Sequence, residues 1–144
     1  MKTKMTKRLL LLVALLVTTF SFSSCEKEDW EAEYNLMGEW KIVEINRKYG
    51  NCPYQPSDRF MFYRDKTIET WGYGGLHEFG DWYIGKYNGY STLHIRFEGS
   101  YEADISADMR SFSEDYLVLD VIDRSSDPYS SNPSRYTLRL IRKY

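Results

Sequence analysis

From Leu36 to the C-terminus, short segments in which apolar and polar residues alternate are separated by turn residues. In the segment 92–97, Leu93, Ile95 and Phe97 fall on one side of an extended chain, and polar residues fall on the other. Alternation over about four to eight residues is typical of a half-buried β-strand. We therefore expect about eight strands, at Trp40–Asn46, Phe60–Tyr63, Thr67–Trp71, Trp82–Ile84, Thr92–Phe97, Tyr101–Ile105, Tyr116–Asp123 and Tyr136–Arg142.

No amphipathic helix is predicted in this region, apart from a turn around Ala107–Ser111. Aromatic residues make up 17% of the chain, and 13 of them are tyrosines, which suits half-buried pleated surfaces. Many short strands at regular spacing favour a barrel or a sandwich. The sequence therefore predicts an all-β fold over residues 36–144, a small antiparallel meander barrel of about eight strands.

The residues LMGEW at positions 36–40 resemble the Gly-x-Trp opening of lipocalin-like domains. The resemblance implies that Gly38 lets the chain enter the first strand tightly and that Trp40 plugs the closed end of the barrel. It also implies that a basic residue near the end of the last strand packs over this tryptophan as a cation–π contact. Arg142 is the best match for that residue, and Arg139 is the alternative.

Residues 1–24 differ from the rest of the chain because they are basic and apolar. A charged start is followed by the apolar run 9–17, which is shorter than the roughly 20 residues needed to span a bilayer. Small residues come next. This order is typical of a cleaved signal peptide, so we expect residues 1–24 to be removed.

The residues FSSC at positions 22–25 resemble the lipobox of bacterial lipoproteins. The resemblance implies that Cys25 carries acyl chains and that residues 25–35 form an acidic tether. The residues EKED at positions 26–29 resemble the surface-export signal of lipoproteins in some Gram-negative gut anaerobes. The protein is then expected on the outer membrane, facing the cell exterior. An ordinary signal peptide and a merely solvated tether are the alternatives.

The charge of the mature chain excludes one class of partner. Removing residues 1–24 takes away four of the 19 basic residues, which leaves 15 against 21 acidic ones, a net charge of −6. Nucleic-acid phosphates require a basic surface. We therefore expect no nucleic-acid partner, and membrane contact only through the acyl chains on Cys25.

The sequence predicts no catalytic residue, no metal site and no cofactor. The two histidines, His77 and His94, do not form a His-Glu-x-x-His pair, and there is no third histidine to complete a closed zinc site. None of the serines in 125–134 lies in a Gly-x-Ser-x-Gly turn. Cys52 has no adjacent His or Lys and is expected to be an inert thiol.

The segment 71–90 interleaves aromatic residues with glycines. Aromatic faces stack on sugar rings or line apolar pockets, and glycines let a ligand approach the backbone. Alternatively, alternate members form the core of two hairpins and the others lie at turns; strand parity places Trp82 and Tyr83 on opposite faces. The predicted ligand-binding residues are Trp71, Tyr73, Trp82 and Tyr87.

Together these features predict a non-enzymatic, lipid-anchored, lipocalin-like module. Its ligand would be a small apolar or amphipathic molecule at the barrel mouth. The alternative is an accessory component of an outer-membrane surface complex that recognises a protein through the loops Asn51–Asp58 and Asp127–Ser134. A further alternative is carbohydrate binding by exposed Trp71, Tyr73 and Tyr87.

Overall fold

The computed structural model describes residues 31–72, 77–87, 90–125 and 131–144. Tyr34–Tyr144 forms a compact unit, and residues 31–36 are helical. The expected signal peptide, Cys25 and the acidic residues after it lie outside the described residues. In the described ranges, no helix is both long enough and apolar enough to cross a bilayer.

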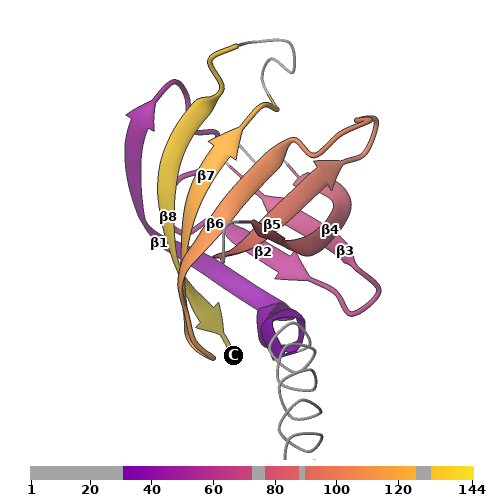
Figure 1. Cartoon of the computed structure of the whole chain (residues 1–144). Helices are drawn as coiled ribbons and strands as arrows, with labels where there is room; N and C mark the ends of the chain where they lie inside the picture. Colours follow the sequence, from indigo (N-terminus) through magenta and orange to yellow (C-terminus); the bar gives the residue numbers. More distant parts are fainter. Residues whose placement is uncertain (1–30, 73–76, 88–89, 126–130) are drawn as a thin grey trace, which may run out of the picture. The chain divides into compact units, whose positions relative to one another are not determined.

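Over the described residues, each strand pairs antiparallel with the next, and β8 pairs back with β1 to close a barrel (Figure 1). The expected all-β meander of about eight strands is confirmed. The strands are β1 (Gly38–Tyr49), β2 (Arg59–Phe62), β3 (Thr67–Trp71), β4 (His77–Tyr87), β5 (Tyr90–Phe97), β6 (Ile105–Phe112), β7 (Tyr116–Asp123) and β8 (Ser134–Lys143).

Two sequence predictions about β6 are wrong, and β4 is longer than expected, at His77–Tyr87 instead of Trp82–Ile84. Strand β6 occupies Ile105–Phe112 instead of Tyr101–Ile105, and the turn expected around Ala107–Ser111 lies inside it. Alanine and aspartate have weak strand preferences, so the segment does not look like a strand in isolation. Pairing with β5 and β7 on both sides overrides that preference.

Apolar side chains fill the barrel interior. In β7 every second residue is buried, as expected for a strand with one face on the core. Large rings contact one another along the barrel: Trp82 meets Phe62 edge-on at 5.6 Å, and Phe62 lies 6.3 Å from Phe60 between ring centroids. Tilted and edge-to-face pairs of this kind contribute stability beyond the area they bury.

Candidate functional site

Trp40 and Arg142 close one end of the barrel, which we call the closed end. Trp40 is fully buried, and its Nε1 donates a hydrogen bond to the Leu36 carbonyl oxygen at 2.8 Å. The guanidinium carbon of Arg142 lies 4.4 Å from the centroid of the Trp40 ring. This is the contact that the Gly-x-Trp resemblance implies. Arg139, the alternative, lies on the outer surface and pairs with Glu44 at 2.8 Å.

Arg142 also holds the backbone that leads into β1. Its Nη1 donates to the Met37 carbonyl oxygen at 2.6 Å, its Nη2 donates to the Asn35 carbonyl oxygen, and its Nε donates to the Glu114 carbonyl oxygen at 2.5 Å. Gly38 has φ +115°, and a Cβ at this position would lie 2.7 Å from Nη1 of Arg142. Both the backbone conformation and the packing therefore require glycine.

The opposite end of the barrel, which we call the mouth, is covered by the β1–β2 connection at residues 50–58, the mouth loop. Tyr54 of this loop is only 3% exposed. Its ring centroid lies 4.9 Å from that of Phe60 and 6.4 Å from that of Tyr136. A side chain from a connection, rather than from a strand, therefore fills the mouth.

Hydrogen bonds fix both ends of the mouth loop. The Asn51 N–H donates to Ser134 Oγ at 3.1 Å, and the Ser57 N–H donates to the Ile42 carbonyl oxygen at 2.8 Å. Gly50 and Ser57 have φ +71° and +84°. A non-glycine residue in this region costs about 1–3 kcal/mol. The segment between these positions is therefore anchored by a sharp turn at each end.

A buried carboxylate lies beneath the mouth loop. Asp123 is 2% exposed, and the Tyr136 hydroxyl donates to its Oδ2 at 2.5 Å. The Ser125 N–H donates to its Oδ1 at 2.8 Å. Burial and the neighbouring charge of Asp123 raise the pKa of Tyr136 far above its usual value. The phenol therefore stays protonated and remains a donor to the carboxylate.

A second carboxyl group, that of Glu78, is close enough to Asp123 for the two charges to interact. Glu78 is half-buried, and burial raises its pKa, as do the charges of Asp104 and Asp123. Burial likewise raises the pKa of Tyr54 well above its usual value, with added contributions from Asp123 and Glu78. The mouth thus combines aromatic walls with a polar, negatively charged rim.

The structure does not bring the predicted ligand-binding aromatic residues into one site. Trp82 is inside the barrel and 1% exposed; its Nε1 donates to the Tyr63 carbonyl oxygen at 3.2 Å, and Lys66 Nζ lies 4.3 Å from its ring centroid. Trp71 lies on the outside, half-buried, and its ring stacks on His77 at 5.0 Å. These two residues face opposite sides of the sheet and cannot line one pocket.

The other two predicted aromatic residues are not placed by the structure. Tyr73 lies outside the described residues, and Tyr87 ends β4 with its side chain likewise outside them. Ligand binding by these two residues, and by Trp71 or Trp82 singly, stays a prediction.

In the described part of the chain, no group of three or more His, Cys, Asp or Glu side chains is placed to hold a metal ion. His77 Nε2 pairs with Glu69 at 3.1 Å. His94 Nδ1 contacts Ser106 Oγ at 3.1 Å, and burial lowers the pKa of His94. Burial raises the pKa of the half-buried Cys52 thiol, which keeps this thiol protonated and unreactive at neutral pH.

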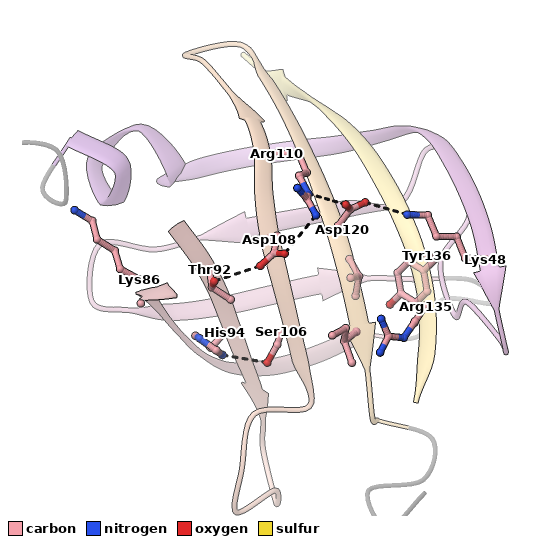
Figure 2. A pocket seen from close by; sticks show the side chains of 13 residues that line it. Lys48, Lys86, Thr92, His94, Ser106, Asp108, Arg110, Asp120, Arg135 and Tyr136 are labelled. Carbon is pink, nitrogen blue, oxygen red and sulfur yellow. Dashed lines mark hydrogen bonds and ion pairs between the residues drawn. The ribbon is translucent and has the colours of Figure 1, made fainter. Parts of the chain in front are cut away.

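A groove of about 530 Å³ crosses the outer face of the barrel (Figure 2). We call it the outer groove. Charged and hydroxyl-bearing side chains from β1 and from β4 to β8 line most of it, and they include Lys48, Lys86, Thr92, His94, Ser106, Asp108, Arg110, Asp120 and Arg135.

Ion pairs run along the outer groove. Arg110 Nε lies 2.8 Å from Asp120 Oδ2, and Arg110 Nη2 lies 3.7 Å from Asp108 Oδ2. Lys48 Nζ lies 3.6 Å from Asp120 Oδ1. Burial alone would raise the pKa of Asp120, but hydrogen bonds from Thr137 and Arg110 and the charge of Lys48 lower it below its usual value. Asp120 is therefore ionised.

Sequence reasoning missed both Tyr54 and the outer groove. The local signal for Tyr54 is a large aromatic residue between Pro53 and Pro56 in a turn-rich segment, where packing against the core is the usual reason for an aromatic ring. The groove has no local signal, because its side chains come from six strands and meet only when the barrel closes.

No protein-family model matches this sequence, and no curated protein matches it. Among solved structures, a complex of bovine odorant-binding protein with a selenium-containing odorant is similar to this chain at 17% sequence identity. The similarity covers 78% of this chain and 73% of that chain, with a TM-score of 0.48. The fold is lipocalin-like. The closed antiparallel meander and the Gly38, Trp40 and Arg142 arrangement at its closed end carry that description.

Proposed function

We propose that this chain is a non-enzymatic binding module, anchored by acyl chains on Cys25 to the outer membrane and facing the cell exterior. Its ligand is a small apolar or amphipathic molecule held at the mouth of the barrel. The anchor and the location rest on the FSSC and EKED residues at positions 22–29. Two or three acyl chains bind a membrane far more durably than one, so the domain itself need not touch lipid.

The position of Tyr54 is the observation that carries the proposal for the mouth. Its ring occupies the end of a row of aromatic side chains, in contact with Phe60 and near Tyr136. Because it comes from a loop, its removal leaves the strand pairing of the barrel intact. A ligand that displaces this ring would meet the same apolar walls and would recover the contacts that Tyr54 gives up.

The polar groups at the mouth favour an amphipathic ligand over a purely apolar one. Thr70 and Glu78 face each other across β3 and β4 on the inner side, and the Asp123–Tyr136 pair lies nearby. An apolar group that covers such polar atoms without hydrogen bonds loses affinity. A ligand with an apolar body and a polar end satisfies both parts of the mouth.

Titration of residues 31–144 with a lipophilic fluorescent probe tests this proposal. We expect saturable binding at micromolar concentrations of the probe, measured through the fluorescence of the probe and of tryptophan. Tyr54→Ala should tighten binding by about tenfold, because the probe no longer competes with the Tyr54 ring for the mouth. A tenfold change in affinity corresponds to about 1.4 kcal/mol.

The matched control for this test is Tyr101→Ala, which changes a tyrosine on another loop at the same end that is 99% exposed. This variant should bind the probe like the parent chain. Absence of binding by the parent chain and by Tyr54→Ala would contradict the proposal.

The filled interior favours a second candidate function, recognition of a protein partner in a surface complex. In this case the barrel is a solid scaffold, and the mouth loop carries the recognition. Capture of one defined partner from crosslinked cells, lost on substitution of the exposed loop residues Gln55 and Pro56, together with no response to lipophilic probes, would favour this alternative.

A further inference from the structure

We propose that the outer groove is a carbohydrate-binding site, separate from the mouth. The groove lies on the outer face of the sheet, whereas the mouth lies at the end of the barrel beneath the mouth loop. Tyr136, which lies near Tyr54 at the mouth, also lines the groove. The variants that test the groove change other residues, so binding at the two sites is tested separately.

Polar side chains at adjacent positions on neighbouring strands form the floor of the groove. Thr92 pairs with Asp108 across β5 and β6, and Asp108 pairs with Asp120 across β6 and β7. His94 pairs with Ser106 in the next row. Paired side chains in a sheet lie about 4.5–5.5 Å apart at Cβ. A ligand in the groove therefore meets hydrogen-bonding groups from several strands at once (Figure 2).

Two β-bulges direct basic side chains toward the same carboxylate, that of Asp120. The register of β6 against β7 shifts between Met109 and Ser111, which makes Arg110 the extra residue. The register of β1 against β8 shifts in the same way around Lys48. Bulges redirect side chains and are common next to functional sites. Here both redirected side chains pair with Asp120, at 2.8 Å and 3.6 Å.

This pairing places fixed donors beside fixed acceptors, which is the arrangement that sugar hydroxyl groups need. Each hydroxyl donates one hydrogen bond and accepts others, so it can bridge Asp120 and Arg110 without separating them. A phosphate group would instead have to compete with Asp108 and Asp120 for the Arg110 guanidinium. Within this cluster the paired charges favour a neutral polyhydroxylated ligand over an anion, and the remaining basic side chains, Lys86 and Arg135, lie at opposite edges of the groove (Figure 2).

An aromatic surface borders the groove on β4. Tyr83 is 54% exposed, and its ring stacks on His94 with 4.7 Å between centroids and an interplanar angle of 16°. Gly85 follows two residues later on the same face and lines the groove. The absence of a side chain at Gly85 leaves open space beside His94. An aromatic face next to polar groups suits a sugar ring, which has apolar C–H faces and polar edges.

The size of the groove fits a short oligosaccharide. Its volume of about 530 Å³ falls within the range of roughly 300–1,000 Å³ that is typical of small-molecule sites. Because the groove is open on the surface, a longer glycan chain can extend beyond it at both ends.

A glycan-binding experiment on the full chain tests this assignment. The chain is purified in a polyoxyethylene detergent, which has no sugar headgroup, and is applied to a printed array of neutral oligosaccharides. The strongest binder is then titrated by calorimetry. We expect at least one neutral oligosaccharide to bind with a dissociation constant of about 1 mM or lower, which corresponds to roughly −4 kcal/mol.

Two groove variants locate the binding. Asp120→Asn removes the charged acceptor but keeps the shape of the side chain. Gly85→Gln fills the space beside His94; its Cβ would lie 3.5 Å from His94 Nε2, an ordinary contact, so this variant should fold normally. We expect each variant to weaken glycan binding by about tenfold or more, or about 1.4 kcal/mol.

The matched control is Asp81→Asn. Asp81 pairs with Arg96 at 2.7 Å on the same outer face but lies outside the groove, so this variant should bind the glycan like the parent chain. The proposal is overturned if no neutral oligosaccharide binds, if Gly85→Gln binds as well as the parent chain, or if inorganic phosphate binds and glycans do not.

Discussion

The Arg142 guanidinium lies over the Trp40 ring at 4.4 Å and at the same time donates hydrogen bonds to the carbonyl oxygens of Asn35 and Met37. One side chain from the last strand therefore fixes both the tryptophan that plugs the closed end and the backbone that leads into the first strand. Because β1 and β8 are the two strands that close the barrel, this contact also reinforces the closure.

Arg142→Met should lower the free energy of unfolding by about 2.5–4 kcal/mol. The estimate combines a cation–π contact of about 0.5–2 kcal/mol with the two part-buried carbonyl oxygens of Asn35 and Met37, which lose their donors at about 1 kcal/mol each. Urea unfolding monitored by tryptophan fluorescence measures the loss. The control is Arg139→Met, whose exposed ion pair with Glu44 is screened by solvent. An equal loss in both variants would contradict the role given to Arg142.

Gly38→Ala should destabilise the protein more than Gly99→Ala. Both glycines have positive φ, at +115° and +88°, but only the Cβ at Gly38 would meet another group, Arg142 Nη1 at 2.7 Å. The backbone term of about 1–3 kcal/mol is common to both variants. The difference in urea midpoint between them isolates the steric term. That difference should shrink in the Arg142→Met background, since the clashing group is then absent.

Tyr136→Phe should cost about 1.5–3 kcal/mol, because a hydrogen bond to a buried charged carboxylate is lost. Tyr136 is one of the donors to Asp123, which is 2% exposed. Thermal and urea unfolding measure the loss. The control is Tyr116→Phe, which removes a hydroxyl that accepts from Arg139 on the outer surface. A smaller effect for Tyr136→Phe than for this control would be inconsistent with a buried, donor-dependent Asp123.

Glu78→Gln should stabilise the protein at neutral pH. Burial raises the pKa of Glu78 in the folded chain above its ordinary value of 4.5. Its ionisation therefore opposes folding: the penalty is absent below pH 4.5 and is complete above the raised pKa. The gain at pH 7 should stay below about 1 kcal/mol, because the side chain is half-exposed and screened.

The pH dependence of Tm tests the role of Glu78. Glu78→Gln should melt above the parent chain at pH 7, and the two curves should converge at acidic pH. Glu98→Gln, which changes an exposed carboxyl group, should follow the parent chain throughout. Curves for Glu78→Gln that run parallel to the parent at all pH values would count against a raised pKa.

Trp82→Ala and Trp71→Ala should differ in stability although the two residues were predicted to share a role. Trp82 is 1% exposed inside the barrel, and deleting a buried tryptophan costs about 3–5 kcal/mol. Trp71 is half-buried on the outer face, so its loss should cost considerably less. Urea unfolding compares them. Similar losses would mean that the two tryptophans are equally buried.

Several parts of the structure follow from local sequence alone. Period-two alternation identifies β3 and β7 with their bounds, because a strand with one buried face must alternate. The Gly38, Trp40 and Arg142 arrangement is implied by the resemblance of residues 36–40 to the Gly-x-Trp opening of lipocalin-like domains, and the contact between Arg142 and Trp40 agrees with it.

Only the tertiary structure decides the remaining features. The segment 105–112 becomes a strand through its pairing partners, which outweigh weak local preference. Alternation assigns Trp71 and Trp82 to faces only once the register of β3 and β4 is fixed. The mouth loop and the outer groove depend on closure, since Tyr54 meets Tyr136, and Lys48 meets Asp120, across large sequence separations. The alternation of buried and exposed residues in each strand is set by local sequence. Contacts between side chains on distant strands form only when the barrel closes.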